Sequence, residues 1–224
     1  MSGFGCDELS LAIAAAGCLL DYVKDTQRNE LPHLTSIRHE RQSDSVILDA
    51  ATRRNLEIDL NLHGGEDNTL LSVYDSTVTA MGTRHLKRWL HRPVRVRSVL
   101  EDRLDAVSRL AQNYAFETTR QALKPISDLE RILARVALRS SRPRDLTRLR
   151  DSLWALPALV TAMPQDTNLL QALQSDIGQY PELCELLSRA LVDSPPVVIR
   201  DGGVLAEGYD LSLIHISEPT RRST

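Results

Sequence analysis

Residues Asp128 to Leu156 read DLERILARVALRSSRPRDLTRLRDSLWAL. The first part of this stretch predicts a helix that begins at Asp128, because apolar residues recur at helical spacing. The residues expected to face inward are Leu129, Ile132, Leu133 and Val136, and those expected to face outward are Arg131, Arg135 and Arg139. This region is therefore expected to consist of helices that pack through one apolar side.

The second part of the stretch predicts a longer helix. Ser141 is expected to be its N-cap and Pro143 to lie in its first turn, since both residue types are favoured there. A narrow seam of leucines follows, made of Leu146, Leu149, Leu153 and Leu156. Seams of this kind are typical of long packed helices. We expect the seam to pack within the chain, with dimerisation as the alternative.

Other helices are expected over residues 9–24, 70–77, 82–92, 98–111, 166–177 and 182–191. The 9–24 helix should be buried, because apolar residues almost surround it. Gly82 is expected to open its helix and Pro93 to end it, while Ser98 and Glu101 predict a capping box for the next one. The apolar sides are expected at Leu70, Val73 and Tyr74, at Leu86, Trp89 and Leu90, and at Leu100, Leu104, Val107 and Ala111.

Short strands are expected near each end of the chain. Alternating apolar residues predict two strands within residues 45–58, and the dipeptide Asp201-Gly202 predicts the turn of a hairpin within residues 197–206. Between these ends, Gly64-Gly65 marks a turn. The expected fold class is mainly α, a helical core with a few short strands near each end.

The composition and charge narrow the functional classes. The chain has 224 residues, of which 42% are apolar and 25% charged, and this excludes a fully disordered protein. Its net charge of −3 hides an asymmetry, because residues 84–150 contain 17 basic and 7 acidic residues and so carry +10. The rest of the chain therefore carries −13. Arginine, which supplies most of the basic residues in this stretch, suits bidentate contact with phosphate or carboxylate.

The basic stretch has two interpretations. A nucleic-acid backbone could be contacted by Arg84, Lys87, Arg88, Arg92 and Arg95, with Arg97 beside them. In the alternative, which we favour, these side chains are solvated helix faces that pair with acids elsewhere in the chain. Aromatic residues that could stack on bases are scarce in this stretch.

Catalytic and cofactor motifs are missing from the sequence. It contains no Gly-Lys dipeptide and hence no P-loop, no H-E-x-x-H, and no cysteine pair at ligand spacing. We therefore expect no catalytic, cofactor-binding or metal-binding residues, and no enzyme activity. The three cysteines fit a reducing compartment, and the apolar run 9–20 is too short to cross a bilayer. These features predict a cytoplasmic protein without a membrane partner.

Five segments carry a resemblance to a known family. They are AAAGCLLDYVKDTQ (14–27), LDAATRRNLEI (48–58), TVTAMGTRHLKRWLHRPV (77–94), DLERILARVALRSSRPRDLTRLR (128–150) and RDGGVLAEGYD (200–210). In this order and spacing, from about Gly3 to Asp210, they resemble the MutS family of bacterial DNA mismatch-repair proteins. The similarity is greatest to the proteobacterial branch of that family.

The resemblance implies an internal piece of a MutS protein. Residues 1–24 would be the last helix of the connector domain, 25–206 the helical core or lever domain, and 207–210 the approach to the DNA clamp. Residues 211–224, LSLIHISEPTRRST, depart from the family and are expected to be a non-native tail. The family's Phe-x-Glu mismatch-reading motif and its P-loop do not occur in the chain.

The resemblance also implies a function. Members of the family recognise mismatched duplex DNA, are driven by ATP with Mg²⁺, form homodimers and work with a MutL-type partner. The part present here would transmit conformational change between the ATPase and the clamp, with no bond-making residues of its own. The alternatives are an independent arginine-rich nucleic-acid-binding module or a helical interaction scaffold.

A first prediction follows from the missing P-loop. The 224-residue chain is expected to bind no ATP, because no glycine-rich phosphate loop is present in its sequence. Equilibrium titration with a fluorescent ATP analogue in the presence of Mg²⁺ measures this. Saturable binding that unlabelled ATP displaces would contradict the prediction.

Overall fold

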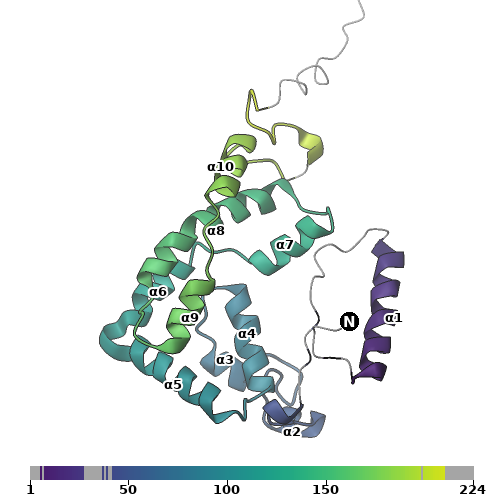
Figure 1. The fold of residues 1–224 in the computed structure, drawn as a ribbon, viewed down its shortest axis with the longest axis vertical. Helices are drawn as coiled ribbons and strands as arrows, with labels where there is room; N and C mark the ends of the chain where they lie inside the picture. Colours follow the sequence, from purple (N-terminus) through teal and green to yellow (C-terminus); the bar gives the residue numbers. More distant parts are fainter. Residues whose placement is uncertain are drawn as a thin grey trace, which may run out of the picture.

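The computed structural model describes Cys6, residues 8–27, Ile37, His39, residues 42–197 and residues 199–209, and the expected non-native tail lies outside these ranges. The described α-helices are α1 Ser10–Gln27, α2 Ala50–Asn55, α3 Leu70–Tyr74, α4 Ala80–His91, α5 Arg97–Ala111, α6 Ala115–Leu123, α7 Leu129–Ala137, α8 Pro143–Ala162, α9 Asn168–Asp176 and α10 Pro181–Ala190 (Figure 1). Short 3-10 turns are η1 Gln42–Asp44, η2 Gln112–Tyr114 and η3 Ile199–Asp201. The fold is mainly α, as the sequence predicts.

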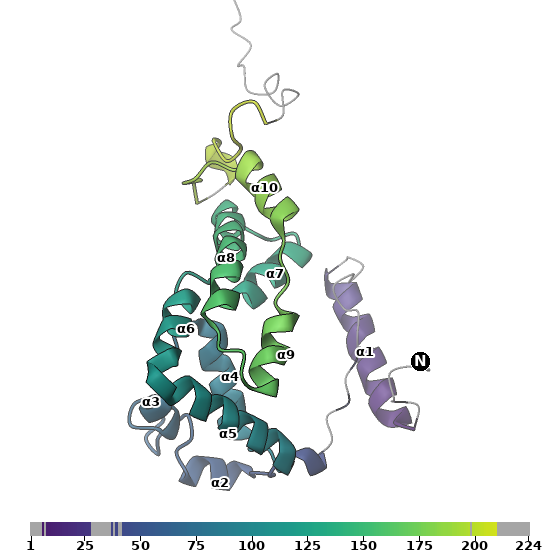
Figure 2. The ribbon, with the colours of Figure 1, turned by 60° about the vertical axis from the view of Figure 1, so that its left-hand side comes forward.

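The core forms around α8, which contacts α6, α7 and α10 (Figures 1 and 2). Leu149 and Leu153 of the leucine seam are buried against Ile132 of α7 and against Cys184 and Leu187 of α10. The other two seam leucines, with Leu129, Ala190 and Val204, pack on the edge of this cluster. The seam therefore packs within the chain.

Buried polar groups in this region are satisfied. Ser152 on α8 is fully buried, and its hydroxyl donates to the Arg148 carbonyl at 2.7 Å and accepts from the Ser127 amide at 2.9 Å. Near the other end of α8, the Thr119 hydroxyl of α6 donates to the Ala162 carbonyl at 3.0 Å. These bonds fix where the loop before α7, and α6 itself, lie along α8, because a buried polar group without a partner is costly.

The prediction of two strands within residues 45–58 is wrong. The segment instead contains α2, which Asp49 caps by accepting a hydrogen bond from the Thr52 amide at 2.6 Å. Its extended part forms one isolated bridge, Ser45 with Val94, on the chain that leaves α4. The alternation that suggested strands covers too few residues to compete with a good N-cap.

The hairpin expected within residues 197–206 is also wrong. Residues Ile199–Asp201 form η3, and Gly202 and Gly203 follow with φ angles of +69° and +64°, a backbone that favours glycine. After the glycines the described chain does not pair with residues 197 and 199–201. Instead Leu205 forms an antiparallel bridge with Leu191 at the end of α10. The glycine pair is a turn signal, but the residue that pairs after the turn is set by tertiary packing.

Three expected helix starts differ from the structure. Helix α4 begins at Ala80 instead of Gly82, because the Thr79 hydroxyl accepts from the Gly82 amide. Helix α5 begins at Arg97, so the expected Ser98–Glu101 capping box does not form, and Glu101 pairs with Arg97 at 2.7 Å. For α8 the N-cap is Arg142 instead of Ser141.

Several expected core faces are exposed. On α5, Leu104 and Val107 are 64% and 61% exposed, while Ala106 is the buried residue. On α7, Leu133 is 53% exposed although Ile132 beside it is buried. The same holds for Val136, Leu70, Val73 and Tyr74, and for Leu11, Leu19 and Tyr22 of the 9–24 helix, which was expected to be buried. A helix buries only the side that a neighbour covers, and periodicity does not identify that neighbour.

Within the described part of the chain, no helix is both long and apolar enough to cross a membrane.

The seam yields a second prediction. Leu153→Ala should lower the free energy of unfolding by about 3 kcal/mol, because it opens a cavity beside Ile132 and Leu187. Leu133→Ala on α7 is the matched control and should cost less than about 1 kcal/mol, since that side chain is mostly exposed. Urea unfolding followed by circular dichroism measures both. Equal losses would show that the core lies elsewhere.

Candidate functional site

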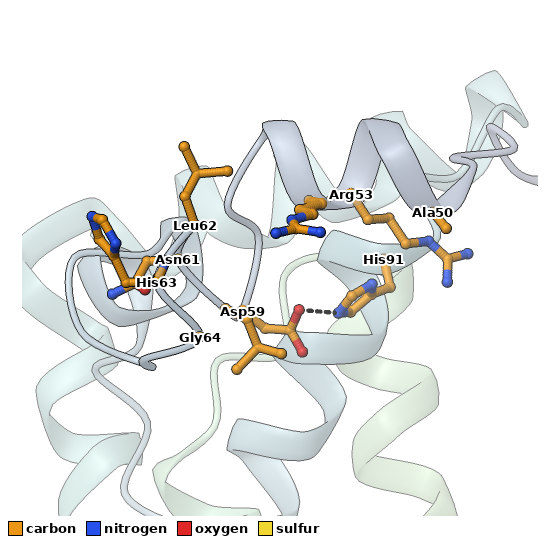
Figure 3. Close-up of a pocket in the computed structure, with 10 residues that line it drawn as sticks. Ala50, Arg53, Asp59, Asn61, Leu62, His63, Gly64 and His91 are labelled. Atoms are coloured by element: carbon orange, nitrogen blue, oxygen red, sulfur yellow. Dashed lines mark hydrogen bonds and ion pairs between the residues drawn. The ribbon is translucent and has the colours of Figure 1, made fainter.

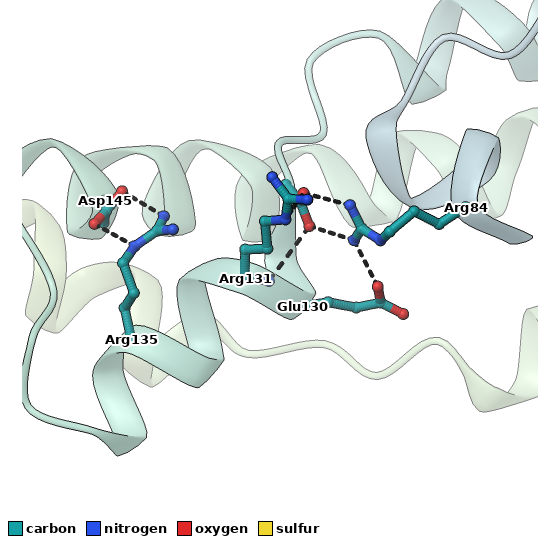
Figure 4. A network of polar contacts seen from close by, with 6 residues as sticks. Arg84, Glu130, Arg131, Arg135 and Asp145 are labelled. Carbon is teal, nitrogen blue, oxygen red and sulfur yellow. Dashed lines mark hydrogen bonds and ion pairs between the residues drawn. The ribbon is translucent and has the colours of Figure 1, made fainter. Parts of the chain in front are cut away.

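Arg84 of α4 binds the start of α7. Its guanidinium donates to both carboxylate oxygens of Asp128, each at 2.7 Å, and to Glu130 Oε2 at 2.6 Å (Figure 4). Asp128 is also the N-cap of α7, where it accepts from the Arg131 amide. The hydrogen bonds from Arg84 lower the pKa of Asp128 although burial acts in the opposite direction. One carboxylate thus caps α7 and joins it to α4.

Lys87 and His91 of the same helix bind Asp59, in the loop between α2 and α3. Lys87 Nζ lies 2.6 Å from Asp59 Oδ2. His91 Nε2 lies 3.1 Å from Asp59 Oδ1, the contact drawn in Figure 3. Burial raises the pKa of Asp59, but the hydrogen bonds from Lys87 and His91 outweigh it, and the net pKa is lowered. This contact joins α4 to the loop after α2.

Arg88 and Arg92 line a cleft of about 510 Å³ between residues 44–48 and α4. Arg53 of α2 and Arg103 of α5 line the same cleft, which we call the basic cleft. Arg95 does not line it, although its backbone amide donates to the Asp44 carbonyl at 3.0 Å. The five candidate residues therefore fall into three groups. Arg84 and Lys87 pair with carboxylates, Arg88 and Arg92 line the basic cleft, and Arg95 is exposed outside it.

Sequence reasoning missed Arg53 and Arg103 as members of this site. Arg53 lies upstream of the basic stretch, and Arg103 lies within it at no distinctive spacing. Folding brings them together because the segment before α2 pairs with the segment after α4. The Arg53-Arg54 pair was the available signal, since two adjacent cations on a short exposed helix favour binding of an anion.

A second junction joins α7 to α8. Arg135 donates to both oxygens of Asp145, at 2.8 and 2.7 Å (Figure 4). The Arg142 amide donates to Asp145 Oδ2 at 3.0 Å. Asp145 is only 6% exposed. Burial raises its pKa, yet Arg135 and the Arg142 amide outweigh burial and lower the pKa. Arg135, expected to face outward, thus points to α8, because Asp145 needs a cation.

Most other basic residues in 84–150 with a described contact also bind inside the chain. Arg109 pairs with Asp166, Arg150 pairs with Asp151 and Asp193, Arg120 donates to the Ser76 carbonyl and Arg144 donates to the Pro195 carbonyl. These contacts link α5, α6 and α8 to distant loops. Arg109 and Arg150 thus pair with acids outside the basic stretch. Arg120 and Arg144 bind backbone carbonyls instead.

A second cleft, of about 570 Å³, is lined by residues of α2, by the loop at 59–64 and by His91 (Figure 3). It shares Arg53 and His91 with the basic cleft and adds Arg54 and His63. Among the described residues, no three His, Cys, Asp or Glu side chains gather in a way that could hold a metal ion. Among the described residues that line the two clefts, no glycine-rich loop leads into a long helix, so neither has the arrangement of a P-loop.

Two family models match the chain. MutS domain III matches residues 51–219, and MutS domain II matches residues 1–35. The chain belongs to the MutS family. It carries segments that match the connector and core domains of this DNA mismatch-repair family. Both junctions lie in the part matched to MutS domain III, whereas the walls of the two clefts also include residues that precede it, His39, 44–48 and Ala50. The sequence resemblance is thereby confirmed.

The junction at Asp145 yields a third prediction. Asp145→Asn should lower the free energy of unfolding of this MutS chain at neutral pH by about 2 kcal/mol, because a buried pair is broken. The folded pKa of Asp145 lies below the unfolded one, so its stabilisation is present above about pH 4 and is lost as the pH falls further. The difference between wild type and variant should therefore narrow in acid.

Urea unfolding at a series of pH values measures this difference. Asp151→Asn is the matched control, because Asp151 is a 59% exposed aspartate on the same helix and also pairs with an arginine. It should cost less than about 0.5 kcal/mol at any pH. A loss for Asp145→Asn that stays constant down to acid pH would contradict the role of the charge.

Proposed function

We propose that this chain is the part of a MutS protein that transmits conformational change between the ATPase and the DNA clamp. The observation that carries the proposal is the pair of bidentate junctions, Arg84 with Asp128 and Arg135 with Asp145, which hold α4, α7 and α8 together. Both junctions lie between helices, where a relative shift would break them.

The helix dimensions support such a role. Helix α8 has 20 residues and so spans about 30 Å, comparable to the width of a small domain. Its seam packs on α7 and α10, and its far end packs on α6. A movement applied at one end is carried to the other because a close-packed helix moves as a rigid body.

Bidentate ion pairs favour discrete arrangements over continuous bending. A guanidinium fork matches a carboxylate in one geometry, and a shift of a few ångströms removes both hydrogen bonds at once. Coupling between distant sites needs an element with two defined states that both sites can bias. The Arg84–Asp128 junction is such an element between α4 and α7.

In this proposal the chain catalyses no reaction. Most of the described carboxylates that might act as acids or bases near the junctions, Asp59, Asp128 and Asp145 among them, are bound by cations of the chain itself. ATP with Mg²⁺, the homodimer, mismatched duplex DNA and a MutL-type partner belong to the full-length protein in this proposal. The family membership supports these assignments.

A fourth prediction tests transmission in a complete MutS protein that carries this segment. Asp128→Asn removes the charge that Arg84 binds, while asparagine still serves as N-cap of α7. In the variant, the factor by which ATP changes the affinity for a mismatched duplex should be about fivefold smaller than in the wild type. A fivefold effect lies within the usual range of coupling between sites. Its affinity for ATP in the absence of DNA should stay that of the wild type, whereas the effect of the duplex on ATP affinity should shrink by the same factor, because coupling between two sites is reciprocal.

Fluorescence anisotropy of a labelled mismatched duplex, with and without ATP, measures this coupling. Asp151→Asn is again the matched control, since its carboxylate pairs within α8 instead of between helices. An unchanged ATP response in the Asp128→Asn variant would overturn the transmission role. A response that disappears equally in both variants would also overturn it, because the effect would not depend on the junction.

A further inference from the structure

Cations outnumber carboxylates on the wall of the basic cleft. Arg53, Arg88, Arg92 and Arg103 line it, and Asp44 is the only acidic residue among the described residues of its wall. Three separate segments supply these side chains: α2, α4 with the residue that follows it, and the middle of α5. The cleft therefore concentrates positive charge from distant parts of the sequence on one surface.

The neighbouring turn of α4 shows the contrast. Arg84 and Lys87 bind carboxylates, but no described carboxylate lies within ion-pair distance of Arg88, which is exposed. The pKa of His85 is lowered, first by burial and then by the positive charges of Arg88 and Arg103. Glu130 of α7 acts in the opposite direction. The positive charge of Arg88 is not neutralised within the described chain.

Trp89 decides how a ligand can be held. The guanidinium of Arg103 covers its ring at 3.9 Å, and the His85 ring lies beside it at 5.0 Å with a tilt of 59°. A base cannot stack on a ring face that a guanidinium already covers. The cleft thus offers charge to a ligand and offers little stacking surface.

We propose that the basic cleft binds the phosphodiester backbone of nucleic acid, without preference for sequence or for a mismatch. Guanidinium groups suit phosphate because they donate two parallel hydrogen bonds to its oxygens. The second cleft adjoins the basic cleft, since Arg53 and His91 line both, and Arg54 also lines the second cleft. A track of cations around one short helix suits a ligand with regularly spaced charges.

This site differs from the nucleic-acid candidates that sequence alone suggests. Arg84 and Lys87 are bound to carboxylates, so the contact passes to Arg88, with Arg53 and Arg103 on the same wall. The site also goes beyond the transmission role, since that role requires nothing to bind at the α2 end of the core. Binding of the chain to DNA without ATP tests the site separately from transmission.

The fifth prediction concerns the double variant Arg53→Ala/Arg88→Ala. Both side chains are exposed and lie on helices, so alanine should preserve the fold. The variant should bind a labelled, fully paired duplex about tenfold more weakly at low salt. The slope of log K against log salt should become shallower by about 0.9 for each phosphate that the variant no longer binds.

Arg139→Ala is the matched control, because Arg139 is an exposed arginine beyond α7 that lines neither cleft. It should leave affinity and salt slope unchanged. Fluorescence anisotropy with the 224-residue chain measures all three proteins, and circular dichroism with urea unfolding verifies that each is folded. Equal affinity of the double variant and the wild type would overturn the proposal.

Four probes separate the possible ligands: a paired duplex, the same duplex with one mismatch, a single strand, and a polyglutamate peptide of equal charge. Similar affinity for the two duplexes, lowered by Arg53→Ala/Arg88→Ala, supports backbone binding. If the single strand alone binds, the same backbone chemistry is read from one strand, and the proposal holds for that source. Tighter binding of polyglutamate than of any nucleic acid would overturn it in favour of an acidic protein partner, and a preference for the mismatch would overturn backbone reading.

Discussion

The buried carboxylate of Asp145 fixes the corner between α7 and α8, and the packing of the helical core depends on that corner. It accepts two hydrogen bonds from Arg135 at the end of α7 and one from the Arg142 amide where α8 begins. Both partners must be in place, because a buried charge without them would be neutralised or exposed. With the corner fixed, Ile132 faces the leucine seam, and α10 can cover the other side of it.

From this corner a line of ion pairs runs back through the core. Helix α7 is held at both ends, by Arg84 on Asp128 at its start and by Asp145 on Arg135 in its last turn. Helix α4, which supplies Arg84, is also joined to Asp59 through Lys87 and His91. Apart from the pair of the buried Asp145, these ion pairs are partly exposed and add little stability one by one. Their effect is positional, since each sets the register of one element against the next, and this is what a transmitting segment requires.

Helices could be predicted from the sequence, whereas partners could not. A helical repeat over nine or more residues is a local property, so α7, α8, α9 and α10 follow from it. The side that is covered depends on neighbours, and for this reason Leu104 and Val107 were assigned to the core although both are exposed. The site is still less local. Arg84 and Asp128 are 44 residues apart, and nothing in their spacing predicts a bidentate pair.

The basic stretch shows why the net charge of a segment is a poor guide to a polyanion site. Its net charge of +10 comes mainly from arginines, which the sequence alone does not distinguish from one another. They differ in whether the fold places a carboxylate beside them. Where a carboxylate is supplied, as by Asp128 or Asp145, the charge is neutralised in place and contributes little field at a distance. Where none is supplied, as around Arg88, the field persists and is strengthened by Arg53 from outside the stretch. Recognition of an anion is therefore decided by the distribution of the acids, since they determine which cations remain available.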